Sequence, residues 1–343
     1  MVCVIARVRM IYQFNFVPYS RPFKSPLKTY HGTWNVRKGI LLRLTDETGE
    51  IGWGEIAPLS WFGSETFKQA ITFCYQLPLQ ITTETILTIP NQLPACQFGF
   101  ESALTAIQHP LSDNNHLNFS GLLPAGKQAL EVWKTLYYRG YRTLKWKIGV
   151  QPIKEELDIF QKLIHQINQT VTVNLDINPI LLRLDGNGGL SYEMARRWLK
   201  MCDFVNSRFS HSNAVKIEFL EQPLPMTQFH QMLELSHEYS TTIALDESVA
   251  TFKQLQACCQ QGWPGIFVVK PAIIGSPRKL KKFCKSYSLD LVFSSAFETL
   301  IGQDAALQLA AKLSLKDRAV GFGVQHWFDG DPNLWLETVK QSI

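Results

Sequence analysis

The sequence predicts an α/β protein, a modified (β/α)₇β barrel of the TIM type with an N-terminal α+β capping domain. Near residue 117 the pattern changes to short apolar runs that alternate with amphipathic helices, as parallel strands and crossover helices do. There are seven or eight such runs, and a closed (β/α) barrel is the simplest arrangement for that number of parallel strands. The 343 residues also accommodate a barrel of roughly 250 residues and a smaller domain. We expect the cap at residues 1–115 and the barrel at 116–324, with about 325–343 packing back on the cap.

The cap is predicted from a hairpin and two helices. Residues 39–58, GILLRLTDETGEIGWGEIAP, read as two strands around the turn DETGE. Ser64 is a candidate N-cap for a helix over 64–77, and residues 98–108 form a second helical segment.

Two cap segments are candidates for contact with the barrel mouth. Residues 25–39 join two strands and are long for a hairpin loop, so we expect them to close over the mouth and help set specificity. Their basic residues are Lys28, Arg37 and Lys38. Trp61 and Phe62 either belong to the core or lie on a cap loop over the same mouth.

The barrel elements alternate in order along the chain. A helix over 126–140 is closed by Gly140, another begins near Pro152, and Ser191 is the candidate N-cap of a third. The expected strands include 117–124, 143–150, 215–223, 241–248, 265–271 and 289–298. No GxGxxG follows the first of them, which argues against a doubly wound open sheet.

Composition narrows the function classes. The net charge of +5 is mild and the basic residues are spread along the chain, so no nucleic-acid partner is predicted. No run approaches the roughly 18 apolar residues of a membrane span, and no export signal is visible. The seven cysteines show no CxxC spacing, as expected of reduced thiols in the cytoplasm. The oligomeric state is left open.

The stretch TLKWKIGV, residues 143–150, places two lysines in a predicted strand. Strand side chains alternate faces with a period of two, so Lys145 and Lys147 point the same way. If that face looks into the protein, two like charges occupy a place where neither is favourable. Such an arrangement needs a compensating partner.

Other charged residues end the neighbouring strands. They are Asp185, Glu221, Asp246 and Lys270. Any one of them could simply reach solvent, but a barrel brings all the strand ends to one mouth, so together they predict a site. Carboxylates without His or Cys partners suit a hard dication such as Mg²⁺, and the eight histidines form no HxH or HExxH pattern for zinc.

A metal would also account for the paired lysines. A dication and a neighbouring ammonium both disfavour protonation of a lysine, which lowers its pKa toward the range of a base. The chemistry that suits this set is abstraction of a proton next to a carboxylate, with the metal holding the enediolate that forms.

The order KxK, RxDxN, EQP, DES and a further Lys resembles the enolase superfamily, in particular its muconate-lactonizing subgroup and, within it, the o-succinylbenzoate synthase family. The resemblance implies Mg²⁺, with Mn²⁺ as a substitute, and a small-molecule carboxylate as substrate. It implies Lys147 as the base, Lys270 on the opposite face of the substrate, and Asp185, Glu221 and Asp246 as metal ligands. It gives Lys145 and Asn187 supporting roles. Ser294 and Ser295, in FSSAFET, resemble a segment that holds the succinyl carboxylate.

The reaction that the resemblance implies is dehydration of 2-succinyl-6-hydroxy-2,4-cyclohexadiene-1-carboxylate to 2-succinylbenzoate, a step toward menaquinone or phylloquinone. An N-acylamino acid racemase or dipeptide epimerase is the alternative, because a base on each face also suits racemisation. A non-enzymatic barrel scaffold is the weakest reading, because such a site would keep many unfavourable charges without a use.

Two positions leave a choice. Asp176 in NLDIN competes with Asp185 in RLDGN as the first metal ligand, and we favour Asp185 because Arg183 completes the RxDxN pattern. The pair Asp329 and Asp331 in FDGDP is either a polar turn, which we favour, or an acidic pair like that by which dipeptide epimerases hold an amino group.

Overall fold

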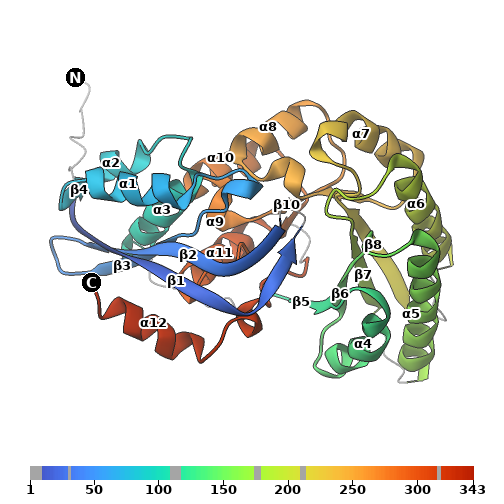
Figure 1. Cartoon of the computed structure of the whole chain (residues 1–343). Coiled ribbons are helices and arrows are strands. Elements are labelled where there is room, and N and C mark those ends of the chain that lie inside the picture. Colours follow the sequence, from blue (N-terminus) through green and yellow to red (C-terminus); the bar gives the residue numbers. More distant parts are fainter. Residues whose placement is uncertain (1–9, 30–31, 109–116, 174–178, 209–213, 315–317) are drawn as a thin grey trace.

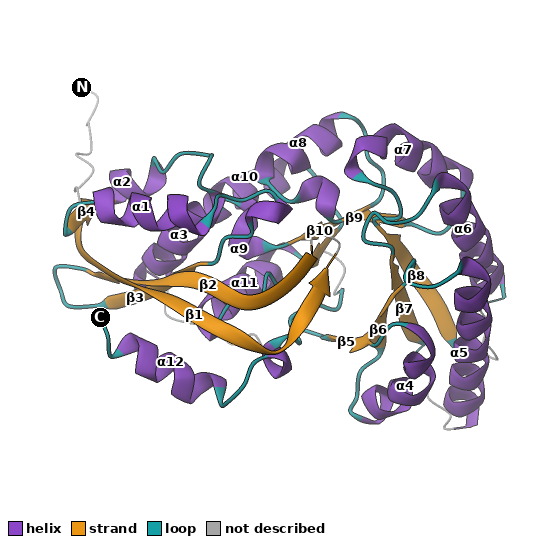
Figure 2. Ribbon diagram, in the orientation of Figure 1, coloured by secondary structure: helices purple, strands orange, loops and turns teal. Residues whose placement is uncertain are grey.

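The computed structural model describes residues 10–29, 32–108, 117–173, 179–208, 214–314 and 318–343. These residues form two sheets that lie beside each other, each with helices packed against it (Figures 1 and 2).

The smaller sheet is antiparallel and belongs to the N-terminal part of the chain. Its strands are β1 (Ile11–Thr29), β2 (Gly32–Thr45), β3 (Ile51–Ile56) and β4 (Gln80–Thr82), in the spatial order β3-β2-β1-β4. Its helices are α1 (Phe67–Gln76), α2 (Thr83–Leu87) and α3 (Pro94–Gln108). This α+β unit is the cap.

The larger sheet is parallel and has seven strands in sequential order. They are β5 (Ser120–Leu123), β6 (Thr143–Lys147), β7 (Ile180–Asp185), β8 (Val215–Glu221), β9 (Ile243–Leu245), β10 (Ile266–Val269) and β11 (Leu291–Phe293). The remaining helices are α4 (Ala129–Tyr138), α5 (Ile153–Val173), α6 (Tyr192–Ser207), α7 (Phe229–Glu238), α8 (Phe252–Gln260), α9 (Pro271–Ile274), α10 (Pro277–Ser286), α11 (Leu300–Leu313) and α12 (Pro332–Lys340).

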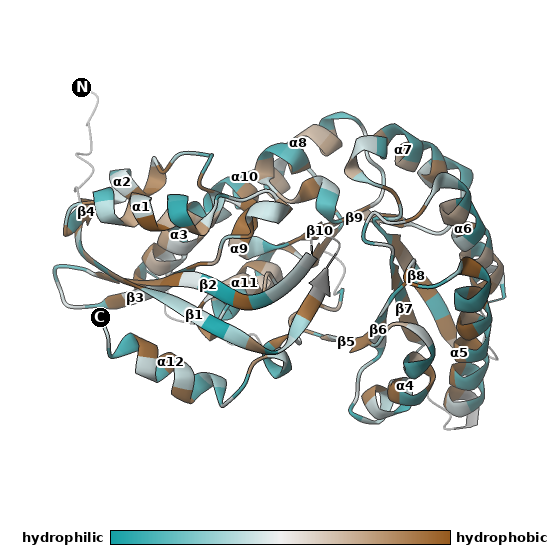
Figure 3. Cartoon of the chain, viewed as in Figure 1, coloured by the Kyte–Doolittle hydropathy of each residue, from teal (hydrophilic) through white to brown (hydrophobic). Residues whose placement is uncertain are grey.

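A short segment near residue 320 joins the two edges of the parallel sheet. Val320 bridges to Phe119, just before β5, and Gly321 bridges to Ser294, just after β11. The curled sheet is thereby closed as the predicted (β/α)₇β barrel. Strands β7 and β8 are largely hydrophobic in Figure 3, whereas α5 and α6 outside them mix hydrophobic and hydrophilic residues, as crossover helices with one buried face do.

Local signals explain where the helices begin and end. Ser191 caps α6 by accepting from the Met194 N–H, and Gly140 follows α4 with φ 93°, as expected for both. The expected cap of α1 at Ser64 is wrong. Thr66 and Gln69 form a reciprocal capping box, so the helix begins at Phe67.

The expected loop over residues 25–39 is also wrong. Residues up to 29 belong to β1 and those from 32 onward to β2, with a register shift between Pro22 and Leu27. Pairing resumes at Leu27 and runs to Thr29, opposite Gly32. Thr33, Trp34 and Val36 of β2 are residue types that favour strands. Lys38 is exposed, whereas Arg37 is buried.

Helix α3 packs against the cap sheet and also contacts the barrel. In the cap, β3 approaches α3 so closely that a Cβ on Gly54 would lie 2.1 Å from the Gly99 carbonyl oxygen. Glu101 of α3 then reaches the barrel, where it accepts from the Ser276 hydroxyl at 2.5 Å and from the Arg278 N–H at 3.0 Å. A cap carboxylate thus holds the start of barrel helix α10.

The C-terminal residues return to the cap sheet. Trp335 of α12 meets Tyr19 of β1 edge to face, with ring centroids 5.4 Å apart, and the Ile343 carbonyl accepts from Arg43 at 3.2 Å. Among the described residues, none of the helices has both the length and the apolar character that a bilayer crossing would need.

Candidate active site

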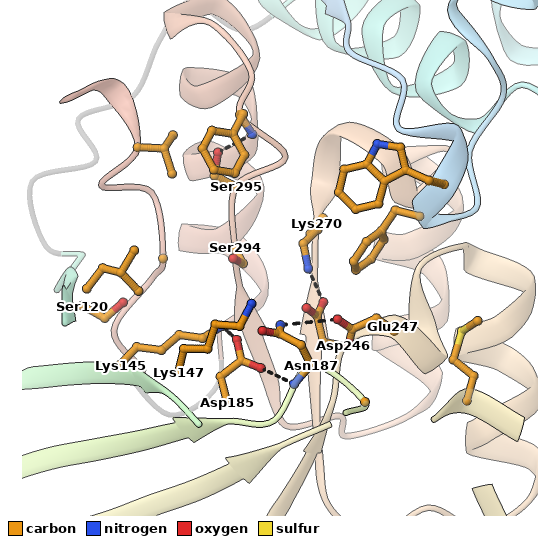
Figure 4. Close-up of a pocket in the computed structure, with 18 of the residues that line it drawn as sticks. Ser120, Lys145, Lys147, Asp185, Asn187, Asp246, Glu247, Lys270, Ser294 and Ser295 are labelled. Atoms are coloured by element: carbon orange, nitrogen blue, oxygen red, sulfur yellow. Dashed lines mark hydrogen bonds and ion pairs between the residues drawn. The ribbon is translucent and has the colours of Figure 1, made fainter. Parts of the chain in front are cut away.

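A cavity of about 440 Å³ opens where the parallel strands end, within the usual size range of small-molecule sites (Figure 4). Of the residues predicted from the sequence, those that line it are Lys145, Lys147, Asp185, Asn187, Asp246, Lys270, Ser294 and Ser295. Glu221 is fully buried and does not itself line the cavity, but it accepts a hydrogen bond from Lys145, which does. The tertiary structure therefore gathers the whole predicted set in one place.

Strand β6 presents both lysines to the cavity. Lys145 and Lys147 are half-buried and point inward, while Trp146 between them is fully buried on the helix side, against Trp198 of α6. The turn after the strand is held by Glu156 of α5, whose carboxylate accepts three successive main-chain N–H groups. The strand period and a fixed turn thus aim the two ammonium groups.

Lys145 lies between two buried carboxylates. Its Nζ is 2.8 Å from Asp185 Oδ2 and 2.7 Å from Glu221 Oε1. The strand register places these groups side by side, because Lys147 pairs with Asp185 and Asp185 with Glu221 across β6, β7 and β8. A pair of buried carboxylates is therefore the compensating partner of Lys145.

The cluster carries strong electrostatic coupling. Burial acts to lower the pKa of Lys145, but the charges of Asp185 and Glu221 outweigh it and raise that pKa. Burial acts to raise the pKa of Asp185, but Lys145 outweighs it and the net pKa is lowered. Burial, followed by the charge of Asp185, raises the pKa of Glu221 to about 8. The site therefore holds more negative charge than one ammonium offsets.

A second ion pair lies across the cavity. Asp246, directly after β9, forms an ion pair with the Lys270 ammonium, which follows β10. Gln222, fully buried, fixes this region, because its side-chain oxygen accepts the N–H of Asp246 at 3.0 Å and that of Ser248 at 3.2 Å. The Gln of EQP thus positions the Asp of DES.

Glu247 is a site residue that our sequence analysis missed. It lines the cavity beside Asp246, and its Oε1 lies 3.5 Å from Asn187 Nδ2. Burial, followed by the charges of Asp246 and Asp185, raises its pKa to about 8. Its position next to Asp246 in DES was the available signal. Ser120, from the first barrel strand, also lines the cavity and was not predicted.

Backbone strain concentrates around the cavity. Asn187, Gln222 and Phe297 are the residues other than glycine with positive φ in the described part of the chain, at 44°, 34° and 60°. All three follow barrel strands at the mouth, and Asn187 and Phe297 line the cavity. Strained main chain of this kind is typical of functional sites that the surrounding fold holds in place.

The donor set fits a hard dication by its chemistry. Asp185, Glu221 and Asp246 end three neighbouring strands and offer only carboxylate oxygens, the ligands that Mg²⁺ prefers. In the structure, Lys145 and Lys270 pair with these oxygens, and among the described residues no three acidic, His or Cys side chains form a ready-made metal cluster. The surplus of buried carboxylates is the observation that favours a dication.

Aromatic residues of the cap cover one side of the cavity. Trp61 and Phe62 lie in a 3₁₀ turn, Ser60–Phe62, and line the cavity, so the cap-loop reading of these residues is correct. The Lys270 ammonium lies 4.1 Å from the centre of the Phe62 ring. Ser294 lines the opposite wall, and Ser295 donates to Glu298 at 2.9 Å.

The two open choices have different outcomes. Asp185 ends β7 at the cavity, whereas Asp176 lies outside the described residues, so the choice of Asp185 as first metal ligand stays a prediction. Asp331 caps α12 by accepting the N–H groups of Asn333 and Leu334, and both Asp329 and Asp331 are exposed and do not line the cavity. This geometry is that of a polar turn and not of an amine-binding pair.

Comparison with known proteins gives matches along most of the chain. Residues 10–107 match the family model "MenC, N-terminal domain" and residues 128–337 match "Enolase C-terminal domain-like". The o-succinylbenzoate synthase of Thermosynechococcus vestitus is 40% identical over 312 residues, which cover 90% of this chain and 91% of that protein.

Solved structures give the same relationship. The o-succinylbenzoate synthase from Thermosynechococcus elongatus BP-1, complexed with Mg in its active site, superposes with a TM-score of 0.82 at 37% identity, covering 96% of this chain and 100% of the other. The L-Ala-D/L-Glu epimerase from Bacillus subtilis superposes with a TM-score of 0.74 at 19% identity, covering 94% and 92%, and shows the shared fold.

The fold, the strand-end carboxylates and lysines, and the domain match define a member of the enolase superfamily. The full-length identity of 40% and the match of the N-terminal domain narrow this further. The chain belongs to the o-succinylbenzoate synthase family.

Proposed function

We propose that the protein dehydrates 2-succinyl-6-hydroxy-2,4-cyclohexadiene-1-carboxylate to 2-succinylbenzoate, as a metal-dependent hydro-lyase that serves menaquinone or phylloquinone synthesis. The observation that carries the proposal is the placement of Lys147 and Lys270 on opposite sides of one cavity, next to a cluster of buried carboxylates. The full-length kinship to o-succinylbenzoate synthases supports the same reaction.

Lys147 would act as the base. It faces the cavity and forms no ion pair with any described residue, so its nitrogen is available to the proton next to the substrate carboxylate. Lys270, across the cavity, would stabilise the negative charge that then develops on that carboxylate. Protonated Lys147 would next assist departure of the hydroxide, and aromatisation of the ring drives the step.

Asp185, Glu221 and Asp246 would hold Mg²⁺, or Mn²⁺ in its place. When bound, the cation supplies Lewis-acid stabilisation of the charge on the substrate carboxylate. Lys145 and Asn187 would support these ligands, since Lys145 already pairs with two of them and the Asn187 N–H donates to Asp185 Oδ1 at 2.9 Å. Ser294 and Ser295 would bind the succinyl carboxylate.

The proposal includes the organisation of the chain. The cap would be residues 1–115 and the catalytic barrel 116–324, with the segment from about 325 onward on the cap. The substrate would be a small carboxylate in the cytoplasm, with no nucleic acid involved.

The deciding experiment offers the purified protein and Mg²⁺ the cyclohexadiene carboxylate, with N-succinyl amino acids and dipeptides assayed in parallel. We expect rapid formation of the aromatic product, followed by its ultraviolet absorbance, and loss of turnover on chelation. Racemisation of N-succinyl amino acids or dipeptides without dehydration would instead identify a racemase or epimerase, which two opposed lysines also permit.

A further inference from the structure

Arg37 is a buried cap residue that bonds the main chain of both walls of the cavity. It lies on β2 and is 2% exposed. Its Nε donates to the carbonyl of Phe297 at 3.1 Å, and its Nη1 donates to the carbonyl of Pro58 at 2.9 Å and to that of Lys38 at 2.8 Å. Phe297 lines the cavity from the barrel, and Pro58 begins the cap segment 58–62, of which Trp61 and Phe62 line the cavity. One guanidinium therefore ties the two walls together.

The barrel wall needs such support because its main chain is strained. Phe297 has φ 60°, which a bulky side chain rarely adopts. Its N–H donates to the Ser295 hydroxyl at 2.9 Å, and its carbonyl receives the Arg37 bond. A strained residue keeps its conformation only when neighbouring groups over-determine it. Arg37 supplies one of these constraints from the other domain.

An aromatic layer links the same two walls. The Trp34 ring packs edge to face against Trp61 of the cap wall, with centroids 5.6 Å apart, and against Phe297 of the barrel wall at 5.4 Å. The Arg37 guanidinium carbon lies 5.7 Å from the centre of the Trp34 ring. Side chains and main chain of the two walls are thus held by two residues of β2, Trp34 and Arg37.

Among the residues that the structure describes, the charge of Arg37 has no partner of opposite sign. No carboxylate of the described residues lies within ion-pair distance of it, and its Nη2 has no hydrogen-bond partner among them. An apolar side chain would fill the same space with less desolvation. What the guanidinium adds is a rigid fork with donors in fixed directions, which one side chain can aim at two loops.

We propose that Arg37 is a positioning residue for the dehydration, holding the wall at 58–62 and the wall at Phe297 at the separation that fits the substrate ring. The identity of the substrate in this inference comes from the proposed function. The coupling of the two walls comes from the hydrogen bonds of Arg37 and does not depend on that function.

The test compares Arg37→Met and Arg37→Lys with a matched control. Arg21 is directly opposite Arg37 in the β1–β2 register and is 3% exposed. It stacks on Phe328 and Trp335 and bonds Gln325, none of which lines the cavity. Arg21→Met therefore removes a similarly buried guanidinium from the same sheet without a direct bond to Pro58 or Phe297. Its link to the barrel wall is indirect, because Gln325 donates to the Glu298 carbonyl at 3.3 Å.

We expect Arg37→Met to raise KM at least tenfold while kcat changes less than threefold. Arg37→Lys should fall between wild type and Arg37→Met, because one ammonium can bond one wall but cannot fork to both. Arg21→Met should leave KM within twofold, whatever its effect on the melting temperature. Equal KM values for Arg37→Met and Arg21→Met would overturn the proposal.

A second readout needs no substrate. Amide hydrogen exchange in residues 59–64 and 295–299 should accelerate together, at least tenfold, in Arg37→Met and not in Arg21→Met. Acceleration in only one segment of Arg37→Met, or in neither, would show that Arg37 does not couple the walls. If Arg37→Met does not fold, Arg37→Lys replaces it, and because its ammonium can still bond one wall, unchanged exchange in both segments would then overturn the proposal. A wild-type protein without dehydration activity would instead count against the proposed function, and the exchange result would still decide the role of Arg37.

Discussion

Two clusters of buried charge occupy the same barrel strands and are built differently. Deeper in the barrel, Glu218 of β8 receives Arg183 at 2.6 Å and Arg318 at 2.5 Å, and Arg318 also makes a two-pronged pair with Asp290 at 2.6 and 2.7 Å. Two guanidinium groups thus balance two carboxylates, and all four carboxylate oxygens have partners. This is the arrangement of a structural ion-pair network.

The cluster at the mouth is unbalanced by comparison. It uses lysines in place of arginines, and burial raises the pKa values of Glu221 and Glu247 to about 8. One oxygen of Glu247 has no hydrogen-bond partner among the described residues. A lysine can lose its proton and move its single charge, whereas an arginine stays charged and fixed. The difference teaches that lysines beside carboxylates with raised pKa values mark the reactive end. Arginines that pair with every oxygen of their carboxylates mark the structural end.

The largest effect is expected for the base. Lys147→Ala should lower kcat by roughly 10² to 10⁴ and leave stability nearly unchanged, because the lost group acts in proton transfer and holds no ion pair with described residues. Lys145→Ala is the contrasting variant. It should destabilise the fold by about 3–5 kcal/mol, because two buried carboxylates lose their partner. Steady-state kinetics and urea unfolding measure both, and near-normal turnover by Lys147→Ala would contradict its role.

Removing a proposed metal ligand should change metal binding and turnover at the mouth of the barrel. Asp185→Asn should weaken Mg²⁺ binding, measured by calorimetry. It should also lower kcat, because the transition state loses several kcal/mol of stabilisation. Asp176→Asn is the control and should bind Mg²⁺ normally. If Asp176→Asn loses Mg²⁺ and Asp185→Asn retains it, our preference between the two is wrong.

Breaking the deeper cluster should have the opposite signature. Glu218→Gln removes the charge that two arginines share, so the free energy of unfolding should fall by about 3–5 kcal/mol. Turnover per folded molecule should stay within a few-fold of wild type. A variant with normal stability and reduced kcat would erase the distinction between the two clusters.

Glu298, a buried carboxyl group outside both clusters, predicts a pH dependence of stability. Burial raises its pKa from 4.5 to about 7, so the folded protein keeps a proton that the unfolded chain has released. Stability should therefore fall as pH rises from about 4.5 to about 7, by on the order of 3 kcal/mol. Glu298→Gln should flatten that part of the profile, because the amide mimics the neutral acid. The free energy of unfolding is measured in urea at pH 5 and pH 7.5. If the difference between the two values is the same in Glu298→Gln as in the wild type, another group causes the pH dependence.

The smallest effect is expected where charge is exposed. Lys162 and Asp158 form an i,i+4 pair on α5 at 2.6 Å, with both side chains more than half exposed. Asp158→Ala should change stability by about 0.3–0.5 kcal/mol, because solvent screens the pair. A loss above about 1 kcal/mol would mean that the distance between charges, and not their burial, sets how much an ion pair stabilises this protein.

Much of the fold and the site could be predicted because local patterns carry them. The alternation of apolar runs with helices predicted the barrel, and the two-residue period in TLKWKIGV predicted that Lys145 and Lys147 share a face. The strand-end position of Asp185, Asp246 and Lys270 predicted that they meet. These inferences depend on backbone periodicity and on the convergence of parallel strands, both of which are readable from the order of residues.

The tertiary structure alone decided how those charges are used. That Lys145 bonds both Asp185 and Glu221 depends on the register of three strands, and no local pattern sets that register. The burial of Arg37 and its bond to Phe297 depend on a contact between segments 260 residues apart. Sequence periodicity specifies which side of an element a residue occupies, whereas its partner is chosen by packing between elements that are distant along the chain.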